Sequence, residues 1–139
     1  MATVIRPELS EKNKYYIDKH RYYELKHFCL QYKEWKKAYA SCNESIIFAS
    51  QIEKTPASNV HSDITAKYAL KKLQYGHRIK MVERIAMEVD DYLYPYILKA
   101  VTEGLSYTHL KTKLNIPCGR DMYYDRYRKF FWLLSEERD

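Results

Sequence analysis

Side chains that can bind anions are concentrated near the C-terminal end of the chain. Between Ser106 and Lys129 there are six Lys or Arg residues and only two acidic residues, Asp121 and Asp125. Guanidinium and ammonium groups bind phosphate oxygens, and a guanidinium can also bond both acceptors on the edge of a guanine. A carboxylate can accept a hydrogen bond from cytosine. These residue types in this density therefore predict recognition of an anion, and of nucleic acid in particular.

The pattern around these side chains predicts a short helix, a corner and a longer helix. Ser106 is a candidate N-cap for a helix of about eight residues. Asn115 tolerates the left-handed conformation in which such helices end, and Pro117 and Gly119 prevent one continuous helix. A second helix is expected from about Arg120 to Glu136. The expected inward-facing residues are Leu110, Leu114 and Ile116, and then Tyr123, Tyr127, Phe130, Phe131 and Leu134.

This order of elements is typical of a helix-turn-helix, in which the second helix enters the major groove of DNA. The first two turns of that helix reach base edges, so the candidate base-reading residues are Arg120, Asp121, Tyr124, Asp125 and Arg128. The candidate phosphate-binding residues, which would position the protein without reading sequence, are Ser106, Tyr107, His109, Lys111, Lys113, Arg126 and Lys129. The alternative is a helical corner whose basic residues are only a solvated surface.

The composition predicts an all-α protein. The chain has 139 residues, of which 46% are apolar, with only three Gly and four Pro. So few helix breakers favour long helices over the many turns of an all-β fold. The net charge of +6 and the pI of about 9.1 indicate an anionic partner. One helical chain is expected, with long N-terminal helices packed against a C-terminal trihelical unit.

The N-terminal half predicts two long helices. Residues 1–17 are expected to form an arm that is ordered only at its end, near Tyr15 and Tyr16. A helix follows over 18–42, capped by Asp18. Residues 43–62 are expected to be a connection, in which "SIIFA" either extends the helix or forms a strand. The second helix spans 63–89, with Ser62 or Asp63 as its cap and Gly76 on its apolar stripe.

Both long helices have an apolar stripe at steps of three and four residues. In the first, the stripe is aromatic and consists of Tyr22, Phe28, Tyr32, Trp35 and Tyr39. In the second, it includes Ala66, Ala69, Leu70 and Leu73 and continues to Val89. Such stripes form either a core or an interface. Residues 18–89 are therefore a candidate interaction region for a homodimer, and residues 90–139 a candidate DNA-binding region.

The junction between these regions predicts a third helix over about 91–103. Asp90 and Asp91 are capping residues by position. Pro95 falls in the first turn, where a missing N–H costs little. Leu93, Ile97, Ala100 and Val101 supply the apolar face, and Gly104 is a natural residue to end the helix.

No motif predicts an enzyme, and neither a metal nor a cofactor is expected. The chain has no Gly-rich phosphate loop, no zinc-ligand spacing and no recognisable nucleophile motif. Cys118 lies close to Arg120, which could lower the pKa of the thiol. Three dispersed cysteines argue against a disulfide framework and for a reducing compartment. No signal peptide and no membrane-spanning run is evident, so a cytoplasmic protein is expected.

The segments "YKEWKK", "SDITAKYALKKLQYGHRIKMVERI" and "GLSYTHLKTKLNIPCGRDMYYDRYRKFFWLL" together resemble the RinA/ArpU group of phage late-gene transcription regulators. The resemblance covers roughly residues 20–138. It implies a phage or mobile-element protein with a C-terminal helix-turn-helix like the fourth region of sigma factors. It also implies that the N-terminal helices dimerise or touch RNA polymerase or another host protein. The alternative function is a small basic protein-binding module: an inhibitor of a host nuclease, a recombination directionality factor or a DNA-packaging accessory.

Overall fold

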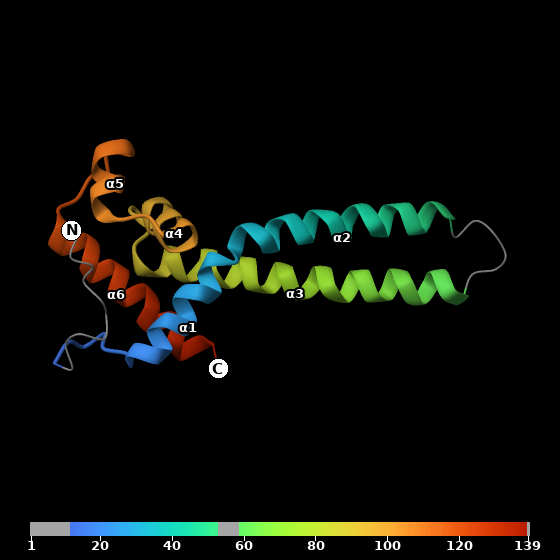
Figure 1. Cartoon of the computed structure of the whole chain (residues 1–139), viewed down its shortest axis with the longest axis horizontal. Coiled ribbons are helices and arrows are strands. Elements are labelled where there is room, and N and C mark those ends of the chain that lie inside the picture. Colours follow the sequence, from blue (N-terminus) through green and yellow to red (C-terminus); the bar gives the residue numbers. More distant parts are fainter. Residues whose placement is uncertain (1–11, 53–58, 139) are drawn as a thin grey trace. The chain divides into compact units, whose positions relative to one another are not determined.

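The computed structural model describes residues 12–52 and 59–138, and within them every regular element is a helix. The elements are α1 (Lys19–Leu30), α2 (Tyr32–Ile52), α3 (Asn59–Val89), α4 (Tyr94–Glu103), α5 (Tyr107–Lys113) and α6 (Arg120–Glu137) (Figure 1). The prediction of an all-α fold is confirmed. The chain divides into two compact units, one of residues 32–81 and the other of the residues before and after that range.

The first helix begins as expected but ends early. The Asp18 carboxylate accepts a hydrogen bond from the backbone N–H of His20, which satisfies one of the unpaired groups at the start of α1. The helix then ends at Leu30, since Gln31 turns its N–H toward the carbonyl oxygens of Phe28 and Cys29. The single helix predicted over 18–42 is therefore two helices. The boundary between the two units coincides with this break.

The core of the first unit is an aromatic cluster between α1 and α6. Tyr22 is 1% exposed, and its ring lies 5.2 Å from the ring of Phe131 in an edge-on arrangement. The hydroxyl oxygens of Tyr22 and Tyr127 are 2.6 Å apart and share a hydrogen bond. Such edge-on contacts add to the gain from burial. The stripe on α1 is thus core at Tyr22 and Phe28, together with Leu25 and Cys29.

Polar contacts tie the two ends of this unit together. Arg21 Nη2 donates to the backbone oxygens of Ser135, at 3.0 Å, and of Arg138. Arg138 donates back to Glu24 at 2.7 Å and stacks over the ring of Phe28. Before α1, the ring of Tyr15 packs on Trp132, and Ile17 is buried. The predicted arm therefore ends in a packed segment, and its residues 1–11 lie outside the described part of the chain.

Asp90, which lies between α3 and α4, accepts three hydrogen bonds. Its Oδ1 atom accepts from the backbone N–H groups of Tyr92 and Leu93, each at 2.9 Å. Its Oδ2 atom accepts from Arg126 Nε at 3.0 Å. Burial alone would raise the pKa of Asp90, but these hydrogen bonds outweigh it, so the pKa lies below its ordinary value of 3.8. Asp90 therefore caps the turn that precedes α4, whereas the N-cap of α4 itself is Leu93, which makes no side-chain cap hydrogen bond.

Replacing Asp90 with Asn should lower stability at neutral pH by about 1–3 kcal/mol, since it weakens a charge-assisted network. A carboxyl whose pKa is lowered by folding contributes stability above its ordinary pKa and loses it as the pH falls through the folded value. The wild-type protein should therefore lose stability below pH 3.8 more steeply than Asp90→Asn. Urea denaturation at a series of pH values measures this. Asp91→Asn, at an exposed position, is the control and should follow the wild type.

The second unit is a helical hairpin of α2 and the N-terminal part of α3, which run side by side in opposite directions (Figure 1). Residues 43–52 belong to α2 and residues 59–62 to α3, so most of the connection predicted over 43–62 is helical. The segment "SIIFA" extends the helix. Ser62 and Asp63 are not caps, because α3 begins before them. Residues 53–58 lie outside the described part.

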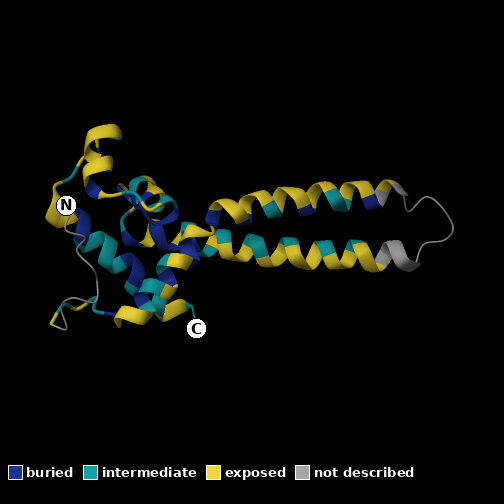
Figure 2. Ribbon diagram, viewed as in Figure 1, coloured by how far each residue is buried: buried dark blue, intermediate teal, exposed yellow. Residues whose placement is uncertain are grey.

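The hairpin buries few side chains. Within it, Tyr32, Trp35, Cys42 and Ala49 are buried, and all four belong to α2. The apolar stripe of α3 is core only in its second half: Val82, Ile85, Ala86 and Val89 are buried in the first unit, whereas Leu70 is 58% and Leu73 71% exposed. Figure 2 shows both hairpin helices as mostly exposed ribbon. The first half of the stripe is therefore not core, and its role as an interface stays a prediction.

Candidate functional site

The corner between α5 and α6 is fixed by its own residues. The Ser106 hydroxyl accepts a hydrogen bond from the N–H of His109 and caps α5. Asn115 has a φ of 53°, the left-handed conformation that ends the helix. Ile116 is fully buried, and its N–H bonds the carbonyl oxygen of Leu110. The predicted Ser cap, Asn turn and Ile plug are all confirmed.

Side-chain contacts hold the following stretch, including Pro117 and Gly119, against α5. The hydroxyl of Tyr107 donates to the backbone oxygen of Cys118 at 2.8 Å. Lys111 Nζ donates to the backbone oxygen of Ile116 at 3.3 Å. The guanidinium of Arg120 stacks over the Tyr107 ring at 5.2 Å. These contacts with α5 thus hold the first residue of α6 in place.

The first turn of α6 faces solvent. Arg120, Asp121 and Met122 are all exposed, Met122 at 48%. Gly119 precedes the helix and supplies no side-chain cap, so the first N–H groups have no side-chain partner among the described residues. The N-terminal end of a helix of 18 residues has a partial positive charge. This turn therefore offers a guanidinium and unpaired N–H groups in the same place.

Four of the residues predicted to contact DNA are buried or paired within the protein. Tyr124, a candidate base reader, is 7% exposed and packs on Tyr123. Tyr107 is 8% exposed, and its hydroxyl is used within the corner. Arg126 is held by Asp90 and by Asp125 Oδ2, the latter at 2.6 Å. These contacts raise the pKa of Arg126, first through the hydrogen bond to Asp90. Burial or ion pairing withdraws Tyr107, Tyr124, Asp125 and Arg126 from direct contact.

The remaining candidates lie at the surface around the corner. Ser106, which caps α5, is exposed, as are His109, Lys111 and Lys113 of α5 and Arg120 and Asp121 of α6. Arg128 and Lys129 are half-buried, a little over two turns after Arg120 along α6. Arg128 Nε is buried and has no hydrogen-bond partner among the described residues. These remaining candidates lie between residues 106 and 129 and include five of the six Lys or Arg residues of that stretch.

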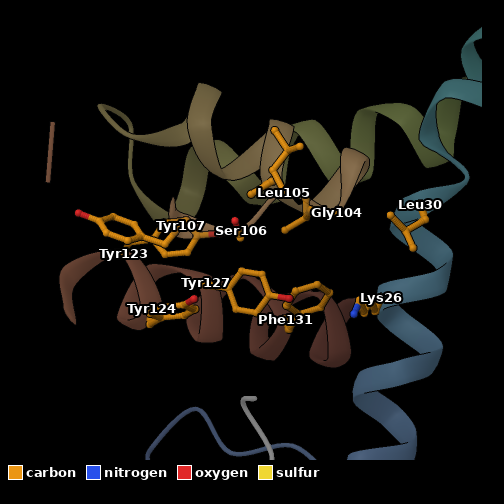
Figure 3. Close-up of a pocket in the computed structure, with 12 residues that line it drawn as sticks. Lys26, Leu30, Gly104, Leu105, Ser106, Tyr107, Tyr123, Tyr124, Tyr127 and Phe131 are labelled. Atoms are coloured by element: carbon orange, nitrogen blue, oxygen red, sulfur yellow. The ribbon is translucent and has the colours of Figure 1, made fainter. Parts of the chain in front are cut away.

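A small aromatic cavity lies behind this surface, between α6, α1 and the turn from α4 to α5 (Figure 3). Its walls include Tyr107, Tyr123, Tyr127 and Phe131, with Lys26 at one side. Its volume is about 120 Å³, whereas pockets for small ligands hold roughly 300–1,000 Å³. Burial raises the pKa values of Tyr123 and Tyr127, so both remain neutral hydroxyls. The cavity is a packing gap in the core.

Neither Cys118 nor Cys29 is an activated thiol. Burial raises the pKa of Cys118, an effect that nearby Lys111 and Arg126 only partly oppose. The expectation that Arg120 might lower this pKa is wrong. Burial also raises the pKa of Cys29. In the described ranges no group of three or more metal-ligating side chains occurs, and no helix is long and apolar enough to cross a membrane.

The aromatic stripe predicted as an interface is mostly inside the chain. Tyr22, Phe28, Tyr32 and Trp35 are between 1% and 7% exposed. Only Tyr39 is accessible, at 37%. A second copy of the chain therefore cannot reach four of the five predicted interface residues without unfolding. This part of the prediction is wrong, for the physical reason that the stripe covers the chain's own helices.

Sequence reasoning missed where most of the net charge lies. Residues 32–81 contain nine Lys or Arg and four Asp or Glu, which gives five of the chain's six net positive charges. The other unit is nearly neutral overall, and its basic corner is balanced by acids elsewhere. A charge count by segment would have revealed this.

Comparison with family models, with curated proteins and with solved structures finds no match to this chain.

Proposed function

We propose that the chain is a DNA-binding protein that contacts duplex DNA through the corner between α5 and α6, and that it regulates transcription in a phage or mobile element. The exposed start of α6 enters the major groove. Arg120 and Asp121 are placed to meet base edges, followed by Arg128 about two turns on. Lys111, Lys113 and Lys129 meet phosphates on either side.

The observation that supports this proposal best is the exposed first turn of α6 beside a rigid corner. A recognition helix must present its N-terminal residues without bending, because base contacts require fixed geometry. Here Ile116 plugs the corner, Tyr107 bonds Cys118, and Arg120 lies stacked and exposed. A corner that served packing alone would have no need of this concentration of cations.

Binding to duplex DNA should weaken steeply as salt rises. Each phosphate contact releases about one counterion, so the slope of log K against log salt is about −0.9 per contact. Three lysine contacts, with Arg120 adding to them, predict a slope between about −2.5 and −4. Fluorescence anisotropy of a labelled duplex between 50 and 300 mM salt, roughly the range in which such slopes are measured, checks this. A slope near zero, or no binding at low salt, contradicts the proposal.

A further inference from the structure

A groove on one face of the hairpin has an apolar floor and a positive rim. Tyr39 of α2 and Ala69, Leu73 and Gly76 of α3 form the floor, and Lys72, His77 and Lys80 lie along it. Ala69, Leu73, Gly76 and Lys80 are spaced at four, three and four residues, which places them in one row along α3. Leu73, at 71% exposed, is the most exposed large apolar side chain of those described.

Small residues make this row suited to a close neighbour. A Cβ atom added at Gly76 would lie 3.1 Å from Cε2 of Tyr39, so the glycine lets the tyrosine ring lie against α3. Glycine inside a helix costs about 1 kcal/mol relative to alanine. Within the row, Leu73 stands between Ala69, one turn before it, and Gly76, one turn after it, where the Tyr39 ring lies. A facing helix can place its own side chains on either side of Leu73, over Ala69 and over the Tyr39 ring, ridge into groove.

The charge around the groove indicates what occupies it. Lys72 lies over the Tyr39 ring and donates to Asn43, and Lys80 and His77 stand nearby along the groove. The whole unit has five net positive charges. A second copy would bring the same cations face to face, which opposes pairing. An occupant with acidic side chains beside an apolar stripe complements both features.

We infer that this groove binds an acidic amphipathic helix of a partner protein, which completes a three-helix bundle with α2 and α3. The row from Ala69 to Lys80 is about 16 Å long, which matches three turns of a partner helix. Its apolar side chains cover Leu73, Ala69 and the Tyr39 ring that lies against Gly76. Its Asp or Glu residues face Lys72 and Lys80. This interaction is separate from the DNA contact at the corner of α5 and α6.

The test is binding of a panel of labelled helical peptides, each about 18 residues and five turns long. Each peptide has one apolar face made of Leu, Val or Ala. The positions that flank this face are all Glu in one set of peptides, all Gln in a second and all Lys in a third. At least one Glu peptide should bind the wild-type protein tenfold or more tighter than its Gln and Lys counterparts, and this preference should shrink with added salt. Binding is measured by fluorescence anisotropy.

Matched variants locate the site. Leu73→Asp and Lys80→Glu should each weaken the Glu peptide at least tenfold. Leu70→Asp and Lys71→Glu, on the same helix but not in the groove, should bind as the wild type does. All four positions are exposed, so circular dichroism should show unchanged helix content. Leu73→Asp should leave duplex DNA binding unchanged, so failure of this inference and failure of the DNA-binding proposal are distinguishable.

Three results would overturn the inference. The first is that no Glu peptide binds better than its Gln counterpart. The second is that duplex DNA displaces the peptide and that binding of the duplex is lost with Lys80→Glu, which would make the groove a nucleic-acid surface. The third is that light scattering finds a wild-type dimer that Leu73→Asp converts to a folded monomer, which would make a second copy the occupant.

Discussion

Phe131→Ala should lower the free energy of unfolding by about 3–5 kcal/mol, the usual cost of removing a buried aromatic ring. Phe131 is fully buried at the meeting point of α1 and α6. Its ring centroid lies 5.2 Å from that of Tyr22, 5.0 Å from that of Tyr127 and 5.1 Å from that of Phe130. Truncation therefore removes three edge-on contacts as well as buried area. Urea denaturation followed by circular dichroism measures the change.

Met122→Ala is the control on the same helix. Met122 is 48% exposed in the first turn of α6, and alanine is at least as good a helix former as methionine. Its unfolding free energy should stay within about 0.5 kcal/mol of the wild type. A loss for Phe131→Ala of less than about 1 kcal/mol would mean that α1 and α6 do not share the core described here.

Arg120→Ala should cost about 1–3 kcal/mol in binding to a preferred DNA site and should relax the choice of base there. The reason is that a guanidinium can bond two acceptors on guanine at once, which no other side chain does as well. Lys113→Ala should instead weaken all duplexes alike and reduce the salt slope by about 0.9. Selection from random duplexes provides the site, and anisotropy on that site and on a scrambled duplex measures both effects.

Arg120→Lys is the matched control, because it keeps the charge but not the paired donors. It should bind scrambled DNA as the wild type does and lose the preference for the selected site. If Arg120→Ala, Arg120→Lys and Lys113→Ala all weaken both duplexes equally, the start of α6 does not read sequence. Since Arg120 also stacks on Tyr107, circular dichroism of each variant must match the wild type.

The sequence predicted local features well where neighbouring residues determine them. Ser106, Asn115 and Gly104 each take the conformation expected of their type, the last with a φ of 69°. Capping and left-handed turns depend on one or two adjacent residues, so a sequence contains the needed information. The core positions of α6 were likewise evident from their spacing, because most of its large apolar residues recur at helical steps.

Features that depend on tertiary contacts were not predictable in the same way. No Gly or Pro marks the break at Gln31, which is the boundary between the two compact units. The hairpin helices extend into "NESIIFAS" and "NVHS", whose Ser and Asn residues are typical of loops. Tyr124 was placed on the open face of α6, but Tyr107 and Tyr123 lie against it and bury it. Periodicity cannot reveal that a helix is covered on more than one face.

The same limit applies to the candidate site. Charge type and spacing identified Lys113 and Arg120, which are exposed. They gave no indication that Arg126 is paired with Asp90, a residue 36 positions away in the sequence. They also placed an interface on the aromatic stripe from Tyr22 to Tyr39, of which only Tyr39 is accessible and lines the apolar groove with α3. Exposure and ion pairing are properties of the folded chain, so residue type alone overestimates a binding site.

The most direct test of the DNA-binding account is amide chemical-shift mapping of the wild-type chain with a short duplex. The hairpin contains most of the net charge, so charge alone would direct DNA to residues 32–81. The account predicts instead that the largest shifts occur over residues 106–130, strongest at Lys113, Arg120 and Asp121, and that they diminish as salt is added. Shifts confined to the hairpin, or none at low salt, would contradict it.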